Sequence, residues 1–222
     1  MKVAPTALLF ALAFSAAQAC DHDDVRRATA INTDPVQRAA IHRRHFAHLA
    51  KNGKRQASKY PPAFATPPKS MTPKEWLDAL DAAEKAGKIP NIPQTRLNSA
   101  GAITYPAGYN VQQACSWTQT ACFGANDISQ APQGVWGLNF DDGPNTPSPT
   151  LYNFLAQQKK AATFFLIGGN IAGNPDAIKQ AQQLGVANLG VHTWSHTVQT
   201  TLSNEDIVAE LGWTMQIIYD LT

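Results

Sequence analysis

The second half of the chain alternates between apolar runs and amphipathic segments. Short apolar runs predict three strands, at 135–140, 162–167 and 187–191. Apolar residues at helical spacing predict three helices, at 150–160, 175–184 and 203–221. Because strands that alternate with helices form parallel sheets, the pattern predicts an α/β fold.

Side-chain signals define where these helices begin and end. Ser203 and Asp206 form a predicted capping box for the last helix, and Gly185 ends the helix before it. The faces predicted to be buried are formed by Leu151, Phe154 and Leu155 in the first helix and by Ile207, Leu211, Met215 and Ile218 in the last.

The first 19 residues have the pattern of a secretory signal peptide. Lys2 gives a positive start, 7–17 is apolar, and Ala17 to Ala19 form a small-residue cleavage site. The apolar run is short for a membrane span, and no other segment is long and apolar enough. We therefore expect a secreted chain, located outside the cell or in the cell wall, whose cysteines meet an oxidising compartment.

Residues 20–72 are predicted to be a basic, proline-rich, flexible leader. Between 35 and 60 there are seven Lys or Arg residues and no acidic residue. His42, His45 and His48 recur every three residues, but the cations around them disfavour a metal site. A solvated leader or pro-segment is the preferred interpretation. The basic face could also hold the protein near anionic wall polymers.

Residues 73–133 are predicted to be an N-terminal extension with one helix and a cysteine loop. Thr72 is the expected N-cap, Pro73 the first helical residue, and Gly87 the stop. The helix is predicted to pack on the outside of the next domain, and 88–109 is predicted to be loop. Cys115 and Cys122 are expected to form a local disulfide, and a zinc site built on them is the weaker alternative.

Composition limits the function classes. With 222 residues the chain can form one ordinary domain with appendages, which we place at 134–222. Its 44% hydrophobic and 15% charged residues exclude wholesale disorder. A formal net charge of +2 gives no indication of nucleic-acid binding.

Four residues that can carry chemistry follow predicted strands. Asp141 and Asp142 end the first strand, and His192 and His196 follow the third. Active sites of α/β barrels are built at this edge of the sheet. Two imidazoles and one carboxylate suit zinc, and cobalt or nickel would fit the same ligands. Each pair alone is common in turns or on surfaces, but the conjunction is much less common by chance.

These residues also resemble a known family. Asn139 to Pro144 (Asn-Phe-Asp-Asp-Gly-Pro) and His192 to His196 (His-Thr-Trp-Ser-His) are similar to the first two motifs of the polysaccharide deacetylases, the NodB-homology group or carbohydrate esterase family four. The residue sequence of the second motif is most similar to that of fungal chitin deacetylases. Asn139 departs mildly, since the family has threonine or serine there. The likeness covers about 134–222.

The resemblance implies roles and a reaction. Asp142, His192 and His196 would bind a divalent metal ion, and Asp141 would be the general base. The reaction would be hydrolysis of the N-acetyl groups of chitin or chitooligosaccharides, giving chitosan and acetate. Alternatives are xylan or peptidoglycan as substrate, and a secreted, non-catalytic polysaccharide-binding protein. Trp136 and Trp194 could stack on sugars, although a buried role is expected for each.

The family pattern extends beyond the motifs in this sequence. Relatives carry a later Arg-Pro-Pro-Tyr motif and a later histidine that acts as general acid, on a distorted barrel of about seven strands. Only three strand–helix units are predicted before Thr222. The sequence-based expectation is therefore an incomplete distorted (β/α) barrel, an N-terminal fragment that folds poorly and catalyses weakly or not at all. A surface anchor further along the protein is also conceivable.

Overall fold

The computed structural model describes residues 59–128 and 130–222. The predicted signal peptide and most of the basic leader, with His42, His45 and His48, lie outside the described residues. Within the described ranges, no helix has the length and apolar character needed to cross a membrane.

Three parallel strands form the central sheet. They are β3 (Asn139–Asp141), β4 (Ala162–Leu166) and β5 (Ala187–Val191), and β4 lies between the other two. Asp141 pairs with Phe165, which in turn pairs with Gly190. The predicted α/β class with parallel strands is confirmed. Over the described ranges, the sheet is open rather than closed into a barrel.

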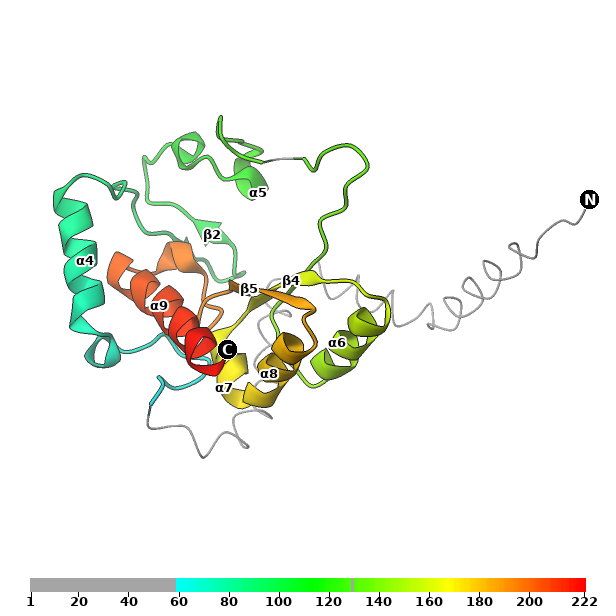
Figure 1. Ribbon diagram of the computed structural model, residues 1–222. Helices are drawn as coiled ribbons and strands as arrows, with labels where there is room; N and C mark the ends of the chain where they lie inside the picture. Colours follow the sequence, from blue (N-terminus) through cyan, green and yellow to red (C-terminus); the bar gives the residue numbers. More distant parts are fainter. Residues whose placement is uncertain (1–58, 129) are drawn as a thin grey trace, which may run out of the picture.

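Helices cover the sheet. They are α6 (Ser148–Gln157), α7 (Gly168–Gly173), α8 (Pro175–Gln183) and α9 (Asn204–Leu221). In Figure 1, α6, α7 and α8 lie on one side of β4 and β5, and the segment with β2 and α5 lies on the other. The core between sheet and helices includes Phe164, Leu166, Ile178 and Ile217, each 3% exposed or less.

The first strand is shorter than predicted. It begins at Asn139 rather than Val135 because, among the described residues, none covers the positions before it: Val135 is 58% and Trp136 87% exposed. The expected burial of Trp136 is therefore wrong, whereas that of Trp194, which is fully buried, is confirmed.

In the helices of the α/β unit, the predicted ends agree with the structure better than the predicted buried faces do. The capping box of Ser203 and Asp206 is present. The predicted buried faces are partly wrong, since Phe154 is 55% and Met215 60% exposed. In α6 the buried residues are Ser148, Tyr152 and Leu155. In α9 they are Ala209, Glu210, Trp213, Thr214 and Ile217. The face of α9 is rotated because it buries a carboxylate, Glu210, whose hydrogen bonds are described below.

Helix α7 is absent from the sequence-based prediction. Its sequence, Gly-Gly-Asn-Ile-Ala-Gly, has low helix propensity. Tertiary contacts compensate: a Cβ at Gly168 would collide with the Trp194 ring, so only glycine permits this close approach.

The helix of the N-terminal extension is α4 (Lys74–Lys85), which packs against α9. The predicted cap is wrong, because the Thr72 hydroxyl donates to the carbonyl of Pro68 and Pro73 takes the N-cap position. The predicted stop is confirmed: the amides of Gly87 and Lys88 donate back into the last turn, with Gly87 at φ +66°.

The rest of the extension is mostly irregular, with a few short elements. The segment predicted as loop contains an antiparallel pair, β1 (Arg96–Leu97) and β2 (Ile103–Thr104). The 3-10 turn η3 (Val111–Ala114) and α5 (Trp117–Thr120) follow, and the structure contains the disulfide between Cys115 and Cys122. The end of the predicted leader packs on the core, since Tyr60 is 4% exposed and lies 6.1 Å from the ring of Trp194.

Candidate metal centre

The carboxyl ends of β3 and β5 bring the predicted site residues together. Asp142 follows β3 and His192 follows β5, with β4 between them. The ladder continues to the first histidine, because the amide of His192 donates to the carbonyl of Leu166 at 2.9 Å. Two parallel strands that flank β4 therefore deliver a carboxylate and an imidazole to one edge of the sheet.

Three side chains converge there. Oδ1 of Asp142 lies 3.0 Å from Nε2 of His192 and 3.2 Å from Nε2 of His196. One ligand atom from each residue lies within 4.8 Å of the others. All three side chains are partly exposed, at 32 to 39%, so a small ion can reach them from solvent.

This donor set fits a divalent cation. Nitrogen and oxygen atoms bound to one zinc ion at roughly 2.0–2.2 Å can be at most about 4.4 Å apart. The two measured separations from Asp142 fall well inside that limit. Two imidazoles and one carboxylate also leave coordination positions open, as catalytic zinc sites do.

The pKa shifts within the cluster favour an ionised carboxylate, and a bound metal ion would take the place of the proton on His192. Hydrogen bonds from His192 and then His196 hold the pKa of the Asp142 carboxyl well below its usual range, although partial burial opposes the shift. The hydrogen bond to Asp142 raises the pKa of His192, again against burial. The carboxylate is thus ionised, as a metal ligand must be.

Asp141 lies beside the cluster, on the last position of β3. Its side chain is exposed, and its Oδ1 accepts a hydrogen bond from Nδ2 of Asn139 at 3.1 Å. Since the two side chains lie two positions apart on one strand, they share a face of the sheet. The residue that departs from the family pattern is thus the one that contacts the predicted base.

Two of the three clustered residues have unusual backbone conformations. Asp142 has φ +67° and His196 φ +63°, in the left-handed region that costs a non-glycine residue free energy. The Asp142 turn is held by Asn170, whose buried Nδ2 donates to the carbonyl of Asp142 at 2.5 Å. At His196, the amide donates to Oγ1 of Thr193 at 3.0 Å.

Glu210 of α9 fixes the loop between the two histidines. Its side chain is fully buried. Its Oε2 accepts hydrogen bonds from the amides of Trp194 and Ser195, both at 2.7 Å, and its Oε1 accepts one from the Ser195 hydroxyl at 2.5 Å. A buried carboxylate is tolerated because its lone pairs are engaged in this way.

Helix α7 and the N-terminal segment hold the same loop from other directions. The amides of Gly168 and Gly169 donate to the carbonyls of Thr193 and Trp194, both at 2.9 Å. The indole N–H of Trp194 donates to the carbonyl of Pro62 at 2.9 Å. We call residues 192–197 the histidine loop. Glu210 and α7 hold its backbone, and Pro62 holds the side chain of its Trp194.

Sequence reasoning did not identify Asn170 or Glu210. The signal for Glu210 was present, because it lies on the helical stripe with Trp213, Thr214 and Ile217. An acid on such a stripe indicates a buried partner. Asn170 gave no comparable signal, because its helix was not predicted.

The sequence of the second half of the chain matches a known protein family. Residues 129–222 match the sequence model of the family described as polysaccharide deacetylase. This part of the chain is thus similar to the domain that defines the polysaccharide deacetylases. The sequence-based resemblance is confirmed.

Curated relatives extend the similarity into the N-terminal region. The chain is 44% identical over 169 residues to chitin deacetylase 3 of Cryptococcus neoformans, covering 74% of this chain and 40% of that protein. It is 35% identical over 140 residues to the chitin deacetylase of Amylomyces rouxii, covering 59% of this chain and 33% of that protein. The chain thus spans two fifths or less of the length of these relatives.

A solved structure of a family 4 carbohydrate esterase from Streptomyces lividans, in complex with acetate, is 32% identical. The match covers 41% of this chain and 47% of that one, with a TM-score of 0.38, which is too low to support an argument about the fold.

Proposed function

We propose that this chain takes part in the hydrolysis of the N-acetyl groups of chitin, giving acetate and free amines on the polymer. The observation that carries the proposal is the convergence of Asp142, His192 and His196 at the end of the parallel sheet, with Asp141 next to them. The family match and the relatives named chitin deacetylases support it.

The roles follow from the chemistry of each side chain. Asp142, His192 and His196 would hold a divalent cation, zinc in the first instance, which when bound acidifies water and polarises a carbonyl group. Asp141, beside this cluster and open to solvent, would accept the proton as the water oxygen attacks the acetamide carbon. The C–N bond then breaks as the nitrogen takes up the proton that Asp141 accepted from the water. Acetate leaves, and the sugar keeps the nitrogen as an amine.

The Asn139 hydrogen bond gives Asp141 a defined orientation for this task. The amide group donates to one carboxylate oxygen and leaves the other free of that contact. Glu210, Asn170 and α7 would act as positioning groups, because they contact the backbone of the ligand-bearing loops and not the reacting atoms.

The proposed setting is outside the cell, as the predicted signal peptide at 1–19 implies. A chitin-type polymer in the wall is the proposed substrate, and xylan or peptidoglycan are the alternatives. Within the proposal, cobalt could replace zinc, since both suit the same donors.

Acetate release from a fully acetylated N-acetylglucosamine hexamer tests this function, with the full chain loaded with zinc. Asp141→Asn should lower the rate by about 10² to 10⁴ fold, the usual contribution of a general base. Its zinc content should stay at the wild-type level, because Asp141 is not one of the three clustered ligands.

Asp176→Asn is the matched control, since Asp176 is 95% exposed at the start of α8 and lies outside the site. It should release acetate at the wild-type rate. Equal rates for Asp141→Asn and wild type would remove the assignment of the base. A zinc-loaded wild type that releases no acetate would favour the non-catalytic, polysaccharide-binding alternative.

A further inference from the structure

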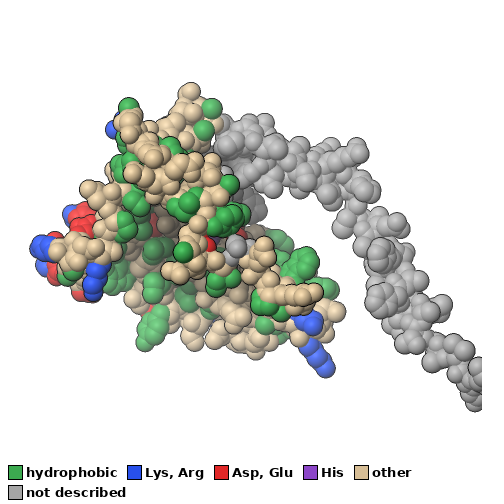
Figure 2. Space-filling model, turned by 90° about the horizontal axis from the view of Figure 1, so that it is seen from above, with side chains coloured by type: hydrophobic (Ala, Val, Ile, Leu, Met, Phe, Trp, Pro, Cys, Tyr) green, Lys and Arg blue, Asp and Glu red, His purple; other side chains and the backbone are tan. Residues whose placement is uncertain are grey.

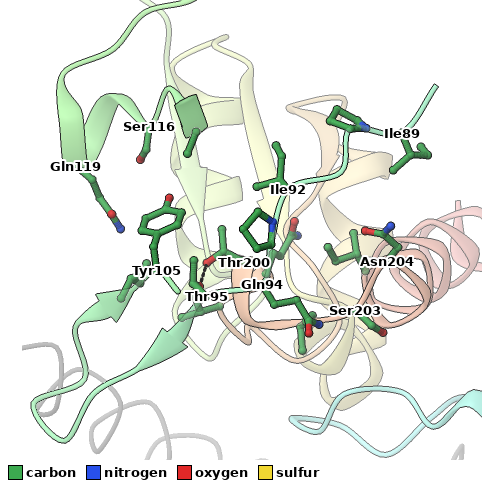
Figure 3. Close-up of a pocket in the computed structure, with 18 residues that line it drawn as sticks. Ile89, Ile92, Gln94, Thr95, Tyr105, Ser116, Gln119, Thr200, Ser203 and Asn204 are labelled. Carbon is green, nitrogen blue, oxygen red and sulfur yellow. Dashed lines mark hydrogen bonds between the residues drawn. The ribbon is translucent and has the colours of Figure 1, made fainter. Parts of the chain in front are cut away.

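A cavity of about 680 Å³ lies between the N-terminal extension and the start of α9. Its volume is within the range of small-molecule sites, roughly 300–1,000 Å³. Figure 3 shows Tyr105, Ser116 and Gln119 on one side and Ile92 and Asn204 on the other. Neither the clustered ligands nor Asp141 lines it, so it is separate from the candidate metal centre.

The two walls of the cavity are joined by hydrogen bonds. The amide of Thr95 donates to the carbonyl of Thr200 at 2.8 Å, and the hydroxyls of the two residues are 2.7 Å apart (Figure 3). Thr95 is buried at 3% exposure. Part of the lining comes from the segment 198–207, which begins only two positions after His196. The cavity is therefore continuous in sequence with the histidine loop.

The lining selects for an uncharged ligand. Of the described residues that line this first cavity, none is Lys, Arg, His, Asp or Glu. A phosphate, carboxylate or ammonium group would lose hydration there without gaining a partner of opposite charge. Neutral hydrogen-bonding groups are present instead, including the exposed amides of Gln94 and Gln119. In the view of Figure 2, which looks at the molecule from above, most of the visible charged side chains lie at the edges.

Tyr105 gives the cavity an aromatic surface. Its ring is partly buried and stacks on Tyr109, with centroids 5.3 Å apart and an interplanar angle of 13°. A second cavity, of about 660 Å³, shares Gln94, Thr95 and Tyr105 with the first, and its lining adds one cationic side chain, Arg96. A linear ligand could thus pass over Tyr105 from one cavity into the other.

We infer that these joined cavities bind an uncharged, N-acetylated glycan chain at a site separate from the metal centre. Sugar rings offer an apolar C–H face for Tyr105, and their hydroxyl and acetamide groups match the neutral amides of the lining. The inference rests on the proposed function in one respect, the choice of N-acetylglucosamine oligomers as the ligand. Such a site would hold the polymer beside the domain that acts on it.

Isothermal titration of the full chain with the fully acetylated hexamer, in excess chelator, tests the inference. Tyr105→Ala should weaken binding by about tenfold, as loss of an aromatic anchor does. Tyr219→Ala removes an 80% exposed tyrosine on α9 and should bind as wild type does. Asp142→Ala should also bind as wild type, because the site does not include the metal ligands.

Wild-type binding by Tyr105→Ala together with lost binding by Asp142→Ala would overturn the inference, since the glycan would then occupy the metal centre alone. If circular dichroism shows that Tyr105→Ala does not fold, Gln119→Ala replaces it, with weaker binding again expected. The deacetylated hexamer should bind more weakly than the acetylated one, and equal affinity would contradict a neutral-ligand site.

These outcomes are independent of the acetate assay. Acetate release without Tyr105-dependent binding would reject the glycan site and leave the proposed function in place. Tyr105-dependent binding without acetate release would reject the proposed function and leave the glycan site in place.

Discussion

The two loops that form the candidate metal centre are held in different ways. The histidine loop has a fully buried centre at Trp194. Glu210 and α7 hold its backbone, and Pro62 accepts a hydrogen bond from the Trp194 indole. The aspartate loop, at 141–144, follows a three-residue edge strand, and the exposed Asp141 lies at its start. Asn170 supplies one hydrogen bond to its backbone, and the amide of Ile167 supplies another to the carbonyl of Gly143.

This difference suits the division of labour in the proposal. Two ligands on a rigid, internally packed loop define where an ion can be bound. A carboxylate that accepts a proton must instead be reachable by solvent and substrate. The comparison predicts that damage to the histidine loop costs folding stability first, whereas damage to the aspartate loop costs mainly metal binding and activity.

Glu210→Ala should have the largest effect. It leaves two buried amides and one hydroxyl without their acceptor and opens a void in α9, so we expect a loss of about 3 kcal/mol or more in unfolding free energy. Urea unfolding followed by tryptophan fluorescence measures it. Glu205→Ala on the same helix is the control, because its exposed pair with Lys69 should contribute about 1 kcal/mol or less. Equal losses would contradict the role of Glu210.

Asn170→Ala tests the aspartate loop. Loss of the hydrogen bond to Asp142 should lower the unfolding free energy by about 1–2 kcal/mol. It should weaken zinc affinity by about 10 to 100 fold, since a positioning contact of a ligand is lost. Equilibrium dialysis against zinc measures the affinity. Asn188→Ala, at an exposed position of β5, should change neither quantity, and wild-type affinity in Asn170→Ala would show that Asn170 does not position the ligand.

Asp220, which belongs to neither loop, should have a smaller effect, on the pH dependence of stability. Burial works to raise the pKa of its carboxyl, but hydrogen bonds from Lys59, Tyr60 and Gln216 outweigh it and lower the pKa. Its contribution to stability is therefore present above the unfolded value of about 3.9 and is lost as the pH falls below it.

Asp220→Asn should consequently lower the unfolding free energy by about 0.5 kcal/mol at pH 7, as expected for an exposed pair. The difference from wild type should shrink as the pH falls toward 3. Thermal melts across this range measure it. A difference that grows on acidification would contradict the direction of the shift.

Local signals in the sequence predicted the parts of this fold that local chemistry determines. The strand ending at Val191, the capping box at Ser203 and the stop at Gly87 were each predicted from neighbouring residues and are confirmed. The four chemically distinctive residues were placed correctly at strand ends, because parallel strands bring their carboxyl ends to one edge.

The features that the sequence did not predict depend on tertiary contacts. Helix α7 exists because its first amides bind the histidine loop and because Gly168 admits Trp194. Met215 is exposed because α9 turns Glu210 inward, toward amides that precede it by about 15 residues. Both causes are contacts between residues far apart in the sequence, so the residues next to α7 or Met215 do not reveal them.

The central claim is that Asp142, His192 and His196 form one divalent-cation site. Cobalt(II) titration of the full chain, followed by visible absorption, tests it most directly. All variants should carry His22, His42, His45 and His48 changed to alanine, so that the leader histidines do not bind the metal. We predict one cobalt ion per chain, and loss of this site in Asp142→Ala, His192→Ala and His196→Ala alike. Unchanged cobalt stoichiometry and spectrum in His192→Ala would contradict the account.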